Sequence, residues 1–365
     1  MGISTPEKRI DQYPHEFSGG MRQRAMIAMA MSCSPKVLIA DEPTTALDVT
    51  IQAQIFELME KLKREHDTAI MLITHDMGVV SELADDVARM FLRSIVERGS
   101  VREVLKYPAH PYTAALLRSI PILHKGRGQR LEPIRGSTPD PYDRPKGCQF
   151  APRCDFAVKS AGRKCLQRSR CVMDMRYAAG TPNRSTPDQR GGRSRMSEKK
   201  VLLELRGVKT FFPVRGGFFN KVRDHVQAVN DVDLDIYKGE TLGLVGESGC
   251  GKTTLGKSII QLVKATDGTM MYDFGPQHGG KKDLRQLNRE DEQVLHRRIQ
   301  IVFQDPYSSL NPSFTIYQSL ADPLRHFGVV NKTNQRALIA DILEAVNMRP
   351  EYMDRYPHEF RGASG

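Results

Sequence analysis

The residues with the clearest chemical potential form one glycine-rich segment, which fits the phosphate-loop pattern G-x-x-x-x-G-K-[ST] without a mismatch. Its glycines let the backbone curl, so that successive N–H groups point at phosphate oxygens. Lys252 would bridge the outer phosphates, and the Thr253 hydroxyl would bind a magnesium ion. The segment therefore predicts a nucleotide site made of Gly246, Glu247, Ser248, Gly249, Cys250, Gly251, Lys252, Thr253 and Thr254.

The elements that must position this loop are also present in the sequence. Residues 241–245 read as a short buried strand, and residues 255–263 read as a helix with apolar residues on one face. The positive end of that helix would favour a bound anion. The strand, glycine-rich turn and helix follow one another in the order that a phosphate loop requires. A glycine-rich turn without function is therefore a poor alternative.

Other apolar runs also end in polar residues that could act on a phosphate. In an open parallel α/β sheet, ligands bind at the carboxyl ends of the strands, so these residues are expected at one edge of a sheet. The runs and the residues that follow them are 37–40 with Asp41 and Glu42, 69–73 with His75, and 299–303 with Gln304.

Composition narrows the class of protein. The 365 residues are 39% hydrophobic and 27% charged, which is ordinary for a soluble protein of two or three domains. No apolar run approaches the roughly 18 residues of a membrane helix, and the N-terminus lacks the apolar core of a signal peptide. These features predict a cytosolic protein. The net charge of +11 arises largely in residues 118–200, which favours a solvated basic linker over a nucleic-acid site.

A pentapeptide recurs near both ends of the chain, as Tyr13–Phe17 and Tyr356–Phe360. After the first copy come four motifs in a fixed order, and together they resemble the second half of an ATP-binding cassette (ABC) ATPase. The motifs are Ser-Gly-Gly-Met-Arg-Gln-Arg from Ser18, Leu-Ile-Ala-Asp-Glu-Pro from Leu38, Thr-Ala-Leu-Asp ending at Asp48, and Ile-Thr-His-Asp ending at Asp76.

The resemblance implies a role for each motif in ATP hydrolysis. Thr253 and Asp41 would serve the magnesium ion, and Gln304 would help to sense it. Glu42 would act as the general base toward water. The remaining implied roles fall on His75 at the γ-phosphate, Phe212 stacked on adenine, Asp48 in the D-loop, and the signature residues Ser18, Gly19 and Gly20, which would act on a second cassette in trans.

Two features narrow the resemblance to the ATPase subunits of dipeptide and oligopeptide importers. One is the Tyr-Pro-His-Glu-Phe pentapeptide, and the other is the segment from His110 to Pro121, which is similar to the tail of that subfamily. Residues 90–96 depart from the pattern, because the family's hairpin usually contains a glycine and this segment has none.

The tail also contains a group of cysteines, and in a reducing cytosol such a group favours a metal over disulfides. The family resemblance suggests an iron–sulfur cluster, and a structural zinc site is the rival. Free thiols are the remaining alternative. The residues are Cys148, Cys154, Cys165 and Cys171.

The predicted fold is an α/β P-loop NTPase core of the ABC type, with its halves in permuted order and joined by an irregular, cysteine-containing tail and a linker. The chain then reads as the end of one importer ATPase joined to the beginning of a second. The predicted domains are 1–100 (signature, Walker B, D-loop and switch histidine), 101–180 (tail), 181–197 (linker) and 198–365 (Walker A and Q-loop, ending at the signature).

The predicted function is that of the ATP-hydrolysing subunit of a peptide importer, peripheral on the cytoplasmic face of the cell membrane. It implies ATP and Mg²⁺ as ligands. The implied partners are a second ATPase subunit or a second copy of this chain, transmembrane permease subunits and, indirectly, a peptide-binding protein, with no nucleic acid. A hybrid that binds nucleotide weakly and drives no transport is the main alternative. An ABC ATPase acting on DNA is a weaker one, because no sustained heptads follow the phosphate loop.

Overall fold

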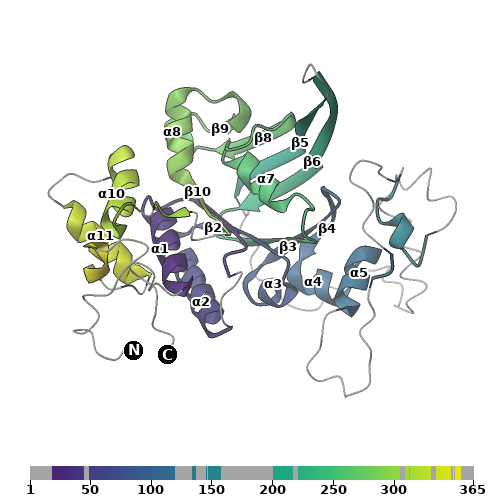
Figure 1. Cartoon of the computed structure of the whole chain (residues 1–365), viewed down its shortest axis with the longest axis horizontal. Coiled ribbons are helices and arrows are strands. Elements are labelled where there is room, and N and C mark those ends of the chain that lie inside the picture. Colours follow the sequence, from purple (N-terminus) through teal and green to yellow (C-terminus); the bar gives the residue numbers. More distant parts are fainter. Residues whose placement is uncertain are drawn as a thin grey trace.

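The structure is a computed structural model that describes residues 19–44, 49–119, 134–136, 145, 147–157, 200–216, 221–304, 309–311, 313–329, 334–346, 348 and 350–354. A central sheet has the strand order β10-β1-β2-β7-β3-β4, and it is parallel except for the β3–β4 hairpin (Figure 1). It contains strands from both ends of the chain, with β10 beside β1 and β7 between β2 and β3. They are β1 (Val37–Asp41), β2 (Ala69–Thr74), β3 (Asp86–Phe91), β4 (Ser94–Ser100), β7 (Thr241–Gly246) and β10 (Ile299–Val302).

The central strands are continuous apolar runs because both faces of the sheet are covered. Every residue of β1, β2 and β7 is buried. Successive side chains point to opposite faces. Leu38 and Leu72 therefore contact the helices on one side, while Ile39 and Met71 belong to the core shared with a second sheet.

The second sheet is antiparallel and has the order β6-β5-β8-β9. It lies above the central sheet in Figure 1, with α7 between the two. The sequence predicts strands at 201–208 and 228–236, and both are longer in the structure, where they pair with each other. The elements are β5 (Val201–Gly216), β6 (Lys221–Tyr237), α7 (Lys252–Ile259), β8 (Asp267–Asp273), η4 (Pro276–His278), β9 (Lys281–Asp283), η5 (Leu284–Gln286) and α8 (Arg289–Arg298).

A helical layer covers the other face of the central sheet and also draws on both ends of the chain (Figure 1). Ala25, Ile27 and Ala28 of α1 are buried, so this helix lies at the centre of the layer. Its elements are α1 (Gly19–Met31), α2 (Val49–His66), α10 (Ile316–His326), α11 (Gln335–Ala345) and η6 (Pro350–Asp354).

The described tail residues lie beside the β3–β4 hairpin. Phe91, Leu92, Tyr112 and Phe150 form a small buried cluster there. The helices in this region are α3 (Met77–Leu83), α4 (Val101–Lys106), α5 (Pro111–Arg118) and η2 (Ala151–Arg153). Among the described residues, no helix combines the length and the apolar character needed to cross a membrane.

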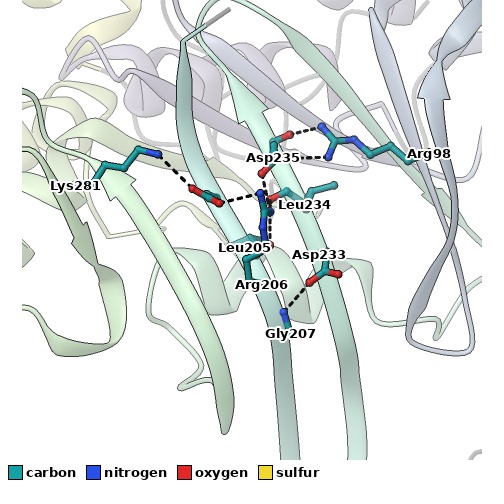
Figure 2. A network of polar contacts seen from close by, with 9 residues as sticks. Arg98, Leu205, Arg206, Gly207, Asp233, Leu234, Asp235 and Lys281 are labelled. Atoms are coloured by element: carbon teal, nitrogen blue, oxygen red, sulfur yellow. Dashed lines mark hydrogen bonds and ion pairs between the residues drawn. The ribbon is translucent and has the colours of Figure 1, made fainter.

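A polar network joins the two sheets (Figure 2). Arg98 of β4 donates to the Asp235 carboxylate and to its backbone carbonyl, both at 3.1 Å. Arg206 approaches the other Asp235 oxygen at 2.7 Å and also pairs with Glu204, which Lys281 contacts at 3.2 Å. The carboxylates thus alternate with cations across the junction.

One local expectation needs correction. The helix after the phosphate loop ends at Ile259 rather than residue 263, because Gln261 adopts a φ of 61° and the chain turns away. At residues 90–96, where the sequence departs from the family pattern, the hairpin forms without a glycine, because Leu92 and Arg93 themselves adopt positive φ.

Candidate nucleotide site

The phosphate loop follows β7 and leads into α7, as the sequence predicts. A Cβ atom at Gly246 would lie 2.4 Å from the Met90 carbonyl oxygen, and one at Gly251 would lie 2.2 Å from that of Ala228. Gly251 also has a φ of 99° at the N-cap of α7. Both positions therefore require glycine, because the neighbouring strands approach the loop too closely for a side chain.

The ammonium of Lys252 lies at the centre of the loop. Its Nζ donates to the carbonyl oxygens of Gly246 at 2.8 Å and Glu247 at 3.1 Å, and the residue is only 5% exposed. The loop carbonyl oxygens therefore hold the cation in place beside the glycine-rich backbone. A fixed cation in such a loop suits a polyphosphate.

Asp41 and Thr253 meet although they are far apart in the sequence. Thr253 Oγ1 donates to Asp41 Oδ1 at 3.0 Å. Burial raises the pKa of Asp41, and the hydrogen bond from Thr253 acts in the opposite direction. A buried carboxylate beside a hydroxyl offers the oxygen ligands that Mg²⁺ prefers, so the two residues fit this ion.

Glu42 is held between two strand ends. Gln304 Nε2 donates to Glu42 Oε2 at 3.0 Å, and His75 Nδ1 lies 3.3 Å from Glu42 Oε1. The Glu42 backbone has a φ of 46°, which directs the chain sharply away after β1. The structure thus brings together three of the side chains that the sequence predicts at the sheet edge.

A cavity of about 650 Å³ lies beside these residues. Such a volume suits a nucleotide-sized ligand. Asp41 does not line the cavity directly and is linked to it through its hydrogen bond with Thr253. The lining residues come from both ends of the chain and from the tail: Glu42, His75, Arg93, Leu116, Ala228, Val245, Gly246, Glu247, Ser248, Gly249, Gly251, Lys252, Thr253, Thr254 and Gln304.

The structure does not bring every predicted residue to this cavity. Phe212 lies on β5, is 41% exposed and is absent from the cavity lining. Gly19 and Gly20 begin α1. Ser18, Asp48, Cys165 and Cys171 lie outside the described residues. Within the described part of the chain, no group of three or more His, Cys, Asp or Glu side chains is arranged to hold a metal ion.

The family described as "Oligopeptide/dipeptide transporter, C-terminal region" matches residues 96–160, and the family described as "ABC transporter" matches residues 1–45 and 229–364. The chain belongs to the ABC ATPases. Its phosphate loop, Asp41, Glu42 and Gln304 fall within the ABC transporter match, whereas Asp48 and His75 lie outside it.

Curated relatives match this ABC ATPase along nearly its whole length. It is 41% identical over 362 residues to the glutathione import ATP-binding protein GsiA of Salmonella typhi, covering 99% of this chain and 50% of that protein. The same protein of Pectobacterium atrosepticum gives the same identity and coverage, as does that of Escherichia coli over 366 residues. The chain therefore spans about half the length of the curated relatives it matches.

Solved structures match less of the chain. A dimeric ATP-binding cassette in a post-hydrolysis state, bound to ADP and Pi, is 22% identical with a TM-score of 0.36. The match covers 43% of this chain and 62% of that one.

Sequence reasoning missed several residues of the ABC ATPase cavity. Arg93 and Leu116 line it, and neither belongs to a phosphate-binding motif. The only sequence signal for Arg93 was the missing glycine in its hairpin. Leu116 belongs to the tail segment that identified the importer subfamily, but nothing in the sequence indicates that it reaches the nucleotide cavity.

Proposed function

We propose that this chain builds one ATP site from both of its halves and hydrolyses ATP there. The observation that carries the proposal is the 3.0 Å hydrogen bond between Thr253 and Asp41, which joins the phosphate loop to the strand-end carboxylates. We call the arrangement a permuted cassette, because the half with Asp41 precedes the half with the phosphate loop. Pairing of β2 with β7 and of β1 with β10 supports it.

Each residue has a defined task in this proposal. Loop N–H groups and Lys252 bind the phosphates, and the Thr253 hydroxyl and Asp41 carboxylate hold Mg²⁺, which neutralises developing charge on the phosphoryl group when it is bound. Glu42 orients a water molecule and accepts its proton. Gln304 and His75 each contact one Glu42 oxygen and so fix the direction in which this base points.

Calorimetric titration with Mg-ATP tests the site. Lys252→Ala should abolish the binding signal, because it removes the cation at the centre of the loop. Glu42→Gln should retain binding and lose phosphate release, because an amide cannot act as the base. Equal binding by wild type and Lys252→Ala would contradict the proposal.

We further propose that ATP hydrolysis powers import of dipeptides or oligopeptides. The tail match to oligopeptide/dipeptide transporters supports this, as do relatives named for glutathione import. The protein would act at the cytoplasmic face of the cell membrane, with transmembrane permease subunits, a second ATPase subunit or a second copy of this chain, and indirectly a peptide-binding protein. Uptake of a labelled peptide that requires the wild-type chain and is lost with Glu42→Gln would support this role.

A second candidate is a hybrid that binds nucleotide weakly and drives no transport. The relatives are about twice as long, and this observation favours it. In a protein of that length each half could pair with another half-cassette. Weak binding of Mg-ATP that Lys252→Ala does not alter, together with no phosphate release, would favour the hybrid.

The predicted domains at 1–100, 101–180, 181–197 and 198–365 remain our proposal for the organisation of the chain. We also propose that the tail cysteines hold a metal or cluster. Cys148 and Cys154 lie on either side of η2, and the other two lie outside the described residues. Metal analysis of anaerobically purified protein, compared with a Cys148→Ser variant, tests this. Equal metal content would contradict it.

A further inference from the structure

The tail reaches the phosphate loop through a rigid aromatic cluster. The Phe91 ring at the end of β3 lies 4.6 Å from the Tyr112 ring of α5 and 5.4 Å from the Phe150 ring, and Tyr112 and Phe150 are 5.5 Å apart. All three side chains are almost fully buried. Because β3 is the parallel neighbour of β7, this cluster lies beside the strand that ends in the phosphate loop.

From this cluster Arg153 extends to the loop itself. Its Nη1 lies 3.4 Å from both carboxylate oxygens of Glu247, the second residue of the phosphate loop. The Arg153 side chain is only 8% exposed, and its Nε donates to the Arg135 carbonyl oxygen at 3.2 Å. The guanidinium also faces the Phe150 ring at 6.0 Å. Arg153 is therefore held from three sides, while the Glu247 side chain remains 29% exposed.

Glu247 creates an electrostatic problem for the loop that contains it. A carboxylate in a loop that binds a polyphosphate repels the ligand, and the repulsion grows with the number of phosphates. Burial raises the pKa of Tyr112, and the negative charge of Glu247 raises it further. Glu247 is therefore close enough to the tail to act on it electrostatically. Arg153 brings an opposite charge to the same carboxylate.

We propose that Arg153 is a positioning residue of the nucleotide site, which neutralises Glu247 and so couples docking of the tail to binding of ATP. The inference rests on the proposed ATP site. It deepens that function, because it makes the importer-type tail part of the machinery that admits the nucleotide. Leu116 of α5 lines the same cavity and supports the same conclusion.

The coupling has two consequences that simple structural support would lack. First, loss of Arg153 should weaken the binding of ATP more than that of ADP and leave the binding of adenosine unchanged. The loss of affinity should be smaller at high salt, because the interaction is Coulombic. Second, coupling is reciprocal, so bound ATP should stabilise the docked tail. Backbone amides of residues 148–154 should then exchange hydrogen more slowly when Mg-ATP is present.

A double-mutant cycle on the full chain tests the inference, with Mg-ATP, Mg-ADP and adenosine as probes. Arg153→Gln should weaken Mg-ATP about tenfold, Arg153→Lys should restore most of the affinity, and Glu247→Gln should bind at least as tightly as wild type. The double variant should match Glu247→Gln alone, because Arg153 acts through that carboxylate. Arg135→Gln, an exposed tail cation that pairs with Asp155, is the matched control and should bind like wild type.

These measurements distinguish a failure of the proposed role of Arg153 from a failure of the proposed ATP site. Binding of Mg-ATP that depends on Lys252 but is equal in wild type and Arg153→Gln would overturn the inference and leave the ATP site standing. An equal loss from Arg153→Gln with Glu247 present or absent, or an equal loss for adenosine and ATP, would also overturn it. Absence of any Lys252-dependent binding would overturn both.

Discussion

At the scale of single residues, the β3–β4 turn beside the cavity contains two residues in a strained backbone conformation. Leu92 and Arg93 have φ values of 40° and 76°, and two-residue hairpin turns that match the twist of a sheet require positive φ at both positions. Residues without glycine's freedom pay roughly 1–2 kcal/mol for this conformation. Arg93 nevertheless occupies the turn and lines the nucleotide cavity.

Two substitutions of Arg93 together measure the free-energy cost of the backbone conformation alone. Both Arg93→Gly and Arg93→Ala remove the guanidinium, but only glycine adopts positive φ without strain. We expect Arg93→Gly to be more stable than Arg93→Ala by about 1 kcal/mol, measured by urea unfolding. Equal stabilities would mean that the turn rearranges when the side chain is lost.

His110 gives the fold a predicted dependence on pH. Burial, with a smaller contribution from the Arg89 cation, lowers the pKa of His110 to about 4. The groups that face it are Arg89 on β3, Glu97 on β4, whose carboxylate accepts from the His110 N–H at 3.3 Å, and Tyr112, whose N–H donates to His110 Nδ1. This last bond requires the neutral imidazole.

The lowered pKa predicts that the folded state loses stability as the solution is acidified. Above pH 6.5 the histidine is neutral in both states, and between pH 6.5 and about 4 the unfolded state binds the proton preferentially. We expect His110 to account for about 2 kcal/mol of the stability lost between pH 7.5 and pH 5. His110→Asn, which keeps an N-cap for α5, should lose that much less over the same range in urea unfolding. Identical pH profiles for the two proteins would contradict the assignment.

At the scale of elements, apolar runs and the residues that end them were sufficient to predict the edge of the sheet. Asp41, Glu42, His75 and Gln304 converge there because parallel strands end at a common edge, which is a rule that sequence spacing can use. The length of β5 and β6 was not predictable. Beyond residue 208 polar and apolar residues mix, and pairing between the two strands, rather than burial, maintains the extended conformation. The entry of Leu116 into the cavity depends on tertiary packing and leaves no sequence signal.

Packing of α3 against β7 can be tested by adding one methyl group. A Cβ atom at Gly243 would lie 3.0 Å from Val80 Cγ1 and 3.3 Å from Ala84 Cβ, so Gly243→Ala forces α3 away from the strand. We expect a loss of about 1 kcal/mol in the free energy of unfolding. In a Val80→Ala background the added methyl has room, and the loss should shrink by at least about 0.5 kcal/mol. Additive effects would show that α3 and β7 do not pack as described.

At the scale of the whole molecule, the two larger hydrophobic cores of the described residues contain residues from the two ends of the chain. The helical core combines Ile27 and Leu58 with Leu320 and Leu343, while the core between the sheets combines Met71 with Leu234. Neither end could bury these surfaces alone. A permuted cassette that folds in this way should therefore unfold as one cooperative unit, with coincident transitions by fluorescence and circular dichroism.

The position of α1 has the largest consequence for turnover. The family resemblance implies that two cassettes enclose ATP, with the phosphate loop of one facing the signature of the other. On that pattern, two copies of this chain arranged head to tail would each supply the signature that faces the phosphate loop of the other. Hydrolysis would then require a dimer with two equivalent composite sites.

We therefore expect the rate of phosphate release to rise more steeply than linearly with protein concentration while the monomer predominates, because each active site needs two chains. Glu42→Gln should trap an ATP-bound dimer that size-exclusion chromatography detects. Lys252→Ala and Ser18→Arg should each be inactive alone, since one removes the phosphate-binding cation and the other blocks the signature. Mixing them should restore one site of the two, since the intact loop of the second variant can face the intact signature of the first. Release that stays strictly linear with concentration in a proven monomer would refute the composite site and would assign hydrolysis to a single chain.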